Sequence, residues 1–147
     1  MLYQILRHSH SVLRWIILLL LVYTFISAVI KRISAQKFSD TEKKASLMSM
    51  AALHIQLLLG LILYFISPKV VFAASSMSNR LIRFFMVEHV IIMLLAITLA
   101  TVGYTQMKKA SSDSLKRKRI IIFYGIALLL ILLGIPWPGM GYSSHLF

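Results

Sequence analysis

Several side chains that can carry charge lie within long apolar stretches of the sequence. Arg14, His54, Glu88 and His89 are the ionisable residues in these stretches, and Gln56 is a neutral polar residue close to His54. An ionisable group at the depth of a membrane costs roughly a few kcal/mol unless it has a partner or a function. These residues are therefore the first candidates for a binding or redox site.

Histidine is the residue type here that best suits a cofactor. The chain contains no cysteine, which excludes disulfides, iron–sulfur clusters and covalent attachment of c-type haem. Two imidazoles on different helices of a bundle can face each other across one b-type haem. Depth along the helices allows two pairs, His10 with His89 and His54 with His89. Three histidines support one haem rather than two, since a two-haem arrangement needs four at two depths.

The spacing around these histidines suggests what surrounds such a haem. His10 and Arg14 share a helix face, so Arg14 could pair with a haem propionate or with Glu88. An Arg14–Glu88 ion pair that only holds two helices together is an equally good prediction. On each of two helices, three residues share one face and form a stripe. Phe85, His89 and Met93 form a stripe that suits an apolar macrocycle, and Gln56, Gly60 and Tyr64 form another, with His54 pointing elsewhere.

A second chemistry uses residues near the two chain ends. His8, His10, Met140 and His145 could collect a copper ion, because imidazole and thioether ligands suit Cu(I). This arrangement requires both terminal segments to converge. An outward-facing protein that handles copper or another metal is therefore an alternative function.

Other function classes find little support. The chain has only four acidic residues, no grouping of serine, histidine and aspartate, and no phosphate-binding glycine loop. The net charge of +12 could suggest nucleic acid, but the basic residues stand between apolar stretches instead of on one polar face. No hydrolase or nucleic-acid function is predicted, and whether the protein is an enzyme stays open.

The elements that must position these residues are apolar helices. Of 147 residues, 59% are hydrophobic and 14% charged, too apolar for the interior of a soluble domain. Each of four segments approaches the ~20 residues that cross a bilayer as a helix. We predict an all-α, integral membrane, four-helix up-down bundle as one domain over residues 1–147, with helices at about 11–30, 47–67, 84–104 and 120–135.

The distribution of basic residues predicts the orientation of this bundle. The first and third loops carry eleven of the sixteen lysines and arginines, and the opposite side carries five. Because basic residues are retained on the cytoplasmic side, the first and third loops should be cytoplasmic, with both termini outside. We expect a multi-pass protein of a bacterial inner (plasma) membrane.

Four stretches of the sequence also resemble a known group of proteins. They are His8–Trp15 (HSHSVLRW), His54–Pro68 (HIQLLLGLILYFISP), Arg83–His89 (RFFMVEH) and Gly134–Pro138 (GIPWP). Together they resemble small four-helix membrane proteins of Bacteroidetes-type bacteria that are labelled cytochrome b. The resemblance covers nearly the whole chain and implies haem ligation among His10, His54 and His89, accompanied by Arg14 and Glu88.

The function expected from these observations is electron transfer by a membrane protein of the b-type cytochrome kind. One haem b would lie between helices, with a quinone or a redox subunit as the partner. The alternative is a non-enzymatic accessory subunit of a larger membrane complex or a homo-oligomer, whose polar residues only fix helix packing.

Overall fold

The protein folds into four long helices. The computed structural model describes residues 1–137, and within them every regular element is helical. The long helices are α1 (Leu2–Ile33), α2 (Asp40–Ile66), α4 (His89–Lys109) and α5 (Asp113–Gly134). Three short elements lead into α4: the 3₁₀ turn η1 (Ala74–Met77), α3 (Arg80–Arg83) and the π-helical turn η2 (Phe84–Glu88). The prediction of an all-helical, four-helix chain is confirmed.

The helices extend beyond the apolar segments from which they were predicted. Helix α1 begins at Leu2 instead of near residue 11, and α2 begins at Asp40 instead of residue 47. Helix α2 starts early because Ser39 and Glu42 form a capping box that satisfies free backbone amides. Helix α5 starts at Asp113 for a similar reason, since the Ser112 side chain accepts from the Leu115 amide. Polar residues thus lengthen these helices past the apolar segments.

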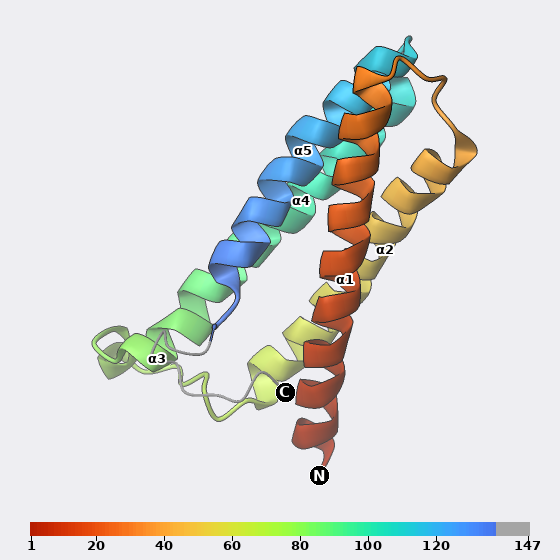
Figure 1. The fold of residues 1–147 in the computed structure, drawn as a ribbon. Coiled ribbons are helices and arrows are strands. Elements are labelled where there is room, and N and C mark those ends of the chain that lie inside the picture. Colours follow the sequence, from red (N-terminus) through yellow and green to blue (C-terminus); the bar gives the residue numbers. More distant parts are fainter. Residues whose placement is uncertain (138–147) are drawn as a thin grey trace.

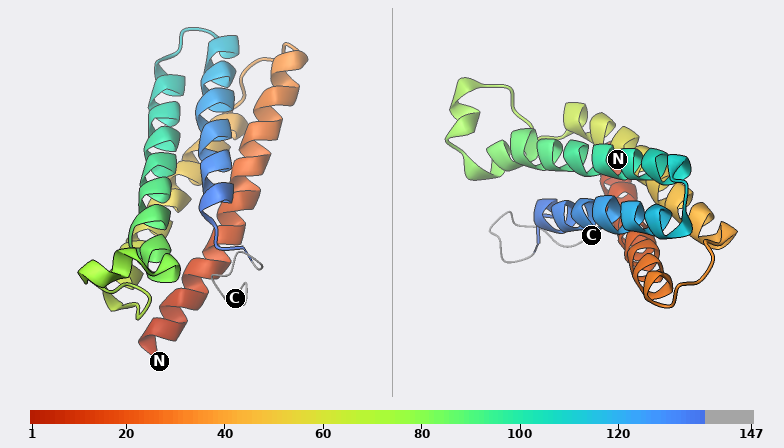
Figure 2. Two further views of the ribbon diagram at one scale, coloured as in Figure 1. Left: turned by 90° about the vertical axis from the view of Figure 1, so that its left-hand side faces the viewer. Right: turned by 90° about the horizontal axis from the view of Figure 1, so that it is seen from above.

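The helices form two antiparallel hairpins packed side by side (Figures 1 and 2). Helix α1 pairs with α2 and α4 pairs with α5, while α5 also packs against α1 and α4 against α2. One end of the bundle carries the two connecting loops, residues 34–39 and 110–112, and we call it the loop end. The other end holds the start of α1, the end of α2 and the start of α4, and we call it the cavity end.

The length and composition of the helices suit a membrane. Within residues 1–137, three helical stretches are long and apolar enough to cross one: Leu2–Ile33, Asp40–Ile66 and Arg80–Lys109. The apolar part of α5, from Ile120 to Gly134, is shorter than the ~20 residues that a span needs. Large apolar side chains such as Leu19, Leu58 and Phe65 face outward, as lipid contact requires.

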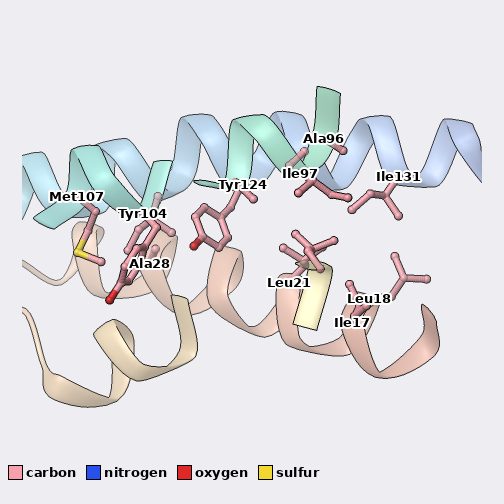
Figure 3. Close-up of a cluster of buried hydrophobic side chains, with 14 of the residues drawn as sticks. Ile17, Leu18, Leu21, Ala28, Ala96, Ile97, Tyr104, Met107, Tyr124 and Ile131 are labelled. Atoms are coloured by element: carbon pink, nitrogen blue, oxygen red, sulfur yellow. The ribbon is translucent and has the colours of Figure 1, made fainter. Parts of the chain in front are cut away.

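The core lies between α1, α4 and α5 (Figure 3). Leu21, Ala96, Ala100 and Ala127 are fully buried there, and small residues let the helices approach closely. At Gly103 an added Cβ would lie 2.5 Å from Cβ of Phe123, an atom fixed to its own backbone. Glycine at this position therefore lets α4 pack closely against α5.

The loop end is closed by a buried ion pair. The Arg117 Nε donates to Glu42 Oε1 at 2.8 Å and Arg117 Nη2 donates to Glu42 Oε2 at 3.0 Å. The same guanidinium donates to the backbone carbonyls of Gln36 and Lys37 in the loop between α1 and α2. Arg117 and Glu42 are 1% and 4% exposed. This pair joins α5, α2 and the first loop.

Candidate functional site

A cavity lies at the cavity end of the bundle, among α1, α2 and α4, with the end of α5 beside it. Its volume is about 210 Å³, and its walls are largely apolar. Both predicted stripes contribute to the walls, with Phe85, His89 and Met93 from one side and Gln56, Gly60 and Tyr64 from the other. The remaining polar or charged side chains of the lining are Tyr3, Arg7, His10, Ser11, Arg14, Ser67 and Lys69.

His89 is held in one orientation. Its Nδ1 lies 2.8 Å from the carbonyl oxygen of Gly134, and because a carbonyl can only accept, Nδ1 carries the proton. Its Nε2 is then the nitrogen with a lone pair for a ligand. The rings of Phe84 and Phe85 pack against the imidazole, with centroids 5.9 and 6.3 Å away. A backbone carbonyl that fixes the tautomer is the arrangement found behind metal-bound histidines.

The carbonyl partner of His89 depends on how α5 ends. The helix stops at Gly134, and Pro136 follows two residues later, where no helix hydrogen bond can be donated. The lack of a side chain at Gly134 is required, because a Cβ would lie 2.4 Å from Met93 Cε and 2.9 Å from Ile92 Cγ2. The end of α5 therefore packs directly against α4 and presents its carbonyl to His89.

His10 faces His89 across the cavity. The two ring centroids are 6.5 Å apart and the ring planes are inclined by 63°. The backbone carbonyl of His10 accepts from Gln56 Nε2 at 2.8 Å, which anchors α1 to α2 at this level. Within the described residues, His10 Nδ1 and Gln56 Oε1 are buried and have no hydrogen-bond partner. Such atoms are uncommon in folded proteins and indicate a place for a further group.

The charged residues of the lining are all basic. Arg7, Arg14 and Lys69 line the cavity, whereas no aspartate or glutamate of residues 1–137 does. The Arg14 guanidinium lies 5.3 Å from the Trp15 ring centroid, and Lys69 Nζ lies 4.7 Å from that of Phe85. An apolar molecule that carries acidic groups would match this combination of walls and charges.

Three of the five predicted site residues meet at this cavity: His10, Arg14 and His89. His54 lies elsewhere on α2, where its ring is exposed and its Nδ1 donates to the Met50 carbonyl at 2.8 Å. The structure therefore brings His10, not His54, to face His89.

The predicted ion pair between Arg14 and Glu88 is not formed. Instead Glu88 Oε1 accepts from Arg83 Nε at 2.8 Å. The π-helical turn explains this, because it brings residues five apart onto one face, which an ordinary α-helix does not. Glu88 thereby pairs with a residue of its own helical segment and not with one of α1.

The alternative copper site gains no support from the described residues. Met140 and His145 lie outside residues 1–137, and His8 is exposed on α1. No cluster of three or more histidine, cysteine, aspartate or glutamate side chains that could hold a metal ion occurs in residues 1–137.

The sequence did not predict the backbone features that position the His10–His89 pair. The Gly134 carbonyl and the π-helical turn are backbone features, and the only signal for the first is the helix-ending sequence Gly134–Pro138. Lys69 is one of the five basic residues counted on the side opposite the basic loops, and its place in the cavity lining was not predicted.

No protein-family model, curated protein or solved structure matches this chain. The resemblance to small cytochrome b-like membrane proteins stays a prediction. What the chain can do must therefore be argued from the site: two opposed imidazoles, one with a fixed tautomer, in an apolar cavity with basic residues.

Proposed function

We propose that the protein binds one b-type haem between His10 and His89 and transfers electrons as a plasma-membrane protein. The observation that carries this proposal is the facing pair of imidazoles, with His89 Nδ1 held by the Gly134 carbonyl so that Nε2 is available. A haem bound in this way would supply a one-electron carrier, whose potential is set by its axial ligands and its burial.

The residues present fit this group in three respects. Imidazole nitrogens bind a metal ion at about 2.0–2.1 Å, so two rings on opposite sides of one ion have centres about 6 Å apart. The 6.5 Å between the His10 and His89 centroids agrees with that separation. The apolar walls suit a macrocycle, and Arg7, Arg14 and Lys69 supply positive charge for its two carboxylates.

The chain's own side chains have distinct tasks in this proposal. His10 and His89 would hold the iron, and the aromatic residues Phe84 and Phe85, which pack against His89, would keep water away from it. The Gln56 side chain donates to the backbone carbonyl of His10 and so fixes the height of His10 on α1 relative to α2. A quinone or a redox subunit remains the expected partner, since electron transfer needs one.

A visible spectrum of the full chain, expressed with added haem precursor and purified in detergent, tests the proposal. The reduced protein should show a Soret band and a low-spin α band. His10→Ala and His89→Ala should each lose the low-spin α band, whereas His54→Ala, an exposed histidine outside the cavity, should keep it. A featureless spectrum of the wild-type protein would favour the alternative of an accessory subunit of a larger complex.

We further propose that both termini lie outside the cytoplasm, as the bias of basic residues predicts. The structure supports this in one respect, because both strongly basic loops lie at the same end of the bundle (Figure 1). A reporter active only outside the cytoplasm should be active when fused after Phe147 and inactive when fused near Asp113. The reverse pattern would invert the orientation.

A further inference from the structure

We infer that the two histidines play unequal roles: His89 is the permanent iron ligand, and His10 is an exchangeable one that small external ligands can replace. The inference rests on the proposed function. The ligand class is small neutral molecules or anions that bind iron through carbon or nitrogen, such as carbon monoxide or cyanide. The protein would then bind such ligands in addition to carrying electrons.

His89 is immobilised from several directions. Its Nδ1–H donates to the Gly134 carbonyl at 2.8 Å, and two phenylalanine rings pack against it. Gly134 in turn cannot shift toward α4, because Ile92 and Met93 already occupy the space next to its Cα. Rotation of the His89 ring would break a buried hydrogen bond and disturb the contact between α4 and α5.

The ring of His10 has no comparable support. Its Nδ1 has no hydrogen-bond partner within the described residues. On the α2 side the ring lies beside Gly60, which leaves it room only because it has no side chain: an added Cβ would lie 3.3 Å from His10 Cε1, a tight contact. The backbone is held by Gln56, but that hydrogen bond reaches the carbonyl and leaves the side-chain torsions free.

The surroundings of His10 in α1 point the same way. Arg7, His8 and Ser9 are exposed, and Ile5 is 55% exposed, so the preceding turns make few contacts. The first turns of α1 also extend past the end of α5 (Figures 1 and 2). Elements with few buried contacts open at lower free energy than packed ones. Here the ring of His10 can leave while the α4–α5 pair keeps its packing.

The exchange itself is a substitution without electron transfer. With haem bound, His10 would give up its bond to the ferrous iron and leave as a neutral imidazole, and carbon monoxide would bind in its place. The bond to His89 is kept. Because the two histidines differ in support and not in residue type, the asymmetry is a property of this chain's packing.

Carbon monoxide binding to the haem-loaded, dithionite-reduced full chain in detergent tests the inference. The wild-type protein should bind carbon monoxide, seen as a shift of the Soret band. His10→Ala should retain haem in a high-spin form and bind carbon monoxide at least about tenfold faster. His89→Ala should bind added haem at least about tenfold more weakly than His10→Ala, because it removes the well-supported ligand itself, and loss of a ligand's hydrogen-bond partner alone costs about 10–100-fold in metal affinity.

Gly60→Ala refines the test without removing a ligand. Its new methyl group should restrict the His10 ring and slow carbon monoxide binding, whereas the control His54→Ala should leave the rate unchanged. The wild-type measurement needs no variant, so it stands even where a substituted protein does not fold.

The outcomes separate this inference from the proposed function. Equal loss of haem in His10→Ala and His89→Ala, or a low-spin wild-type protein that does not bind carbon monoxide, overturns the inference and leaves the proposed function in place. A wild-type protein without haem overturns both.

Discussion

The two ends of the bundle both bury polar side chains, but they differ in how these groups are satisfied. At the loop end, Arg117 and Glu42 form two hydrogen bonds with each other, and the Tyr124 hydroxyl donates to the Ser46 carbonyl at 2.7 Å. At the cavity end, His10 Nδ1 and Gln56 Oε1 are buried without hydrogen-bond partners within the described residues.

The paired groups of the loop end hold helices together, and the unpaired atoms of the cavity end fit the binding role proposed for the cavity. A buried polar atom without a partner costs about 1–3 kcal/mol, whereas a paired one adds a little stability. The loop end carries no such cost at these residues and acts as a clamp between the hairpins. The cavity end retains the cost, which is expected where a bound molecule completes the contacts. Four experiments test whether the two ends differ in this way.

The largest effect is expected at the buried ion pair of the loop end. Arg117→Met or Glu42→Gln alone should lower the free energy of unfolding by about 3–5 kcal/mol, because each leaves a buried partner unpaired. The double variant should cost less than the sum of the two. Denaturant unfolding in detergent micelles measures all three. Strictly additive losses would show that the pair does not act as a unit.

Next in size is the contrast between two glycines. Gly103→Ala should cost about 1–3 kcal/mol, since the new Cβ would lie 2.5 Å from Cβ of Phe123, an atom fixed to its backbone. Gly60→Ala in the haem-free protein should be close to neutral, because it meets only the far end of His10 and alanine is about 1 kcal/mol better in a helix. Similar losses of stability in both variants would contradict a looser cavity end.

A smaller effect distinguishes paired from unpaired polar groups. Thr24→Val removes the Thr24–Ser49 hydrogen bond of 3.0 Å at the loop half of the core and should cost about 0.6 kcal/mol, a typical value within membranes. His10→Leu in the haem-free protein should cost nothing or stabilise, since it removes a buried nitrogen without a partner. Thermal unfolding of both variants side by side checks the opposite signs.

The smallest effect is expected at Asp113, at the surface of the loop end. The Phe38 backbone amide and the Lys116 ammonium hold the pKa of the Asp113 carboxyl below its usual range. A lowered pKa in the folded state gives stability that is present above the unfolded pKa of about 3.9 and is lost as the pH falls through the folded pKa. Asp113→Asn should therefore lower the Tm slightly at pH 7, and the difference should vanish in strong acid.

The sequence was sufficient for the helices but not for their ends. Apolar stretches such as residues 47–67 predict a helix because lipid leaves no other economical conformation. They do not show that Ser39 and Glu42 start the helix seven residues earlier, since capping depends on local hydrogen bonds and not on hydrophobicity.

The candidate site divides in the same way. Helical periodicity placed Gln56, Gly60 and Tyr64 on one stripe and pointed His54 away from it, and all three stripe residues line the cavity. Depth alone could not choose between His10 and His54, because the choice depends on which face of each helix turns inward. The Arg14–Glu88 prediction was wrong because it rested on charge and depth alone, and these do not show that Glu88 pairs with Arg83 of its own segment.

That π-helical turn, Phe84–Glu88, also bears on how the chain could have arisen. A π turn holds one residue more than the α-helical geometry around it, so it is the form that a single-codon insertion takes inside an existing helix. Because the wide turn takes up this residue within itself, the flanking helix keeps its faces, and removing one residue of the turn would restore a regular helix with His89 still on its present face.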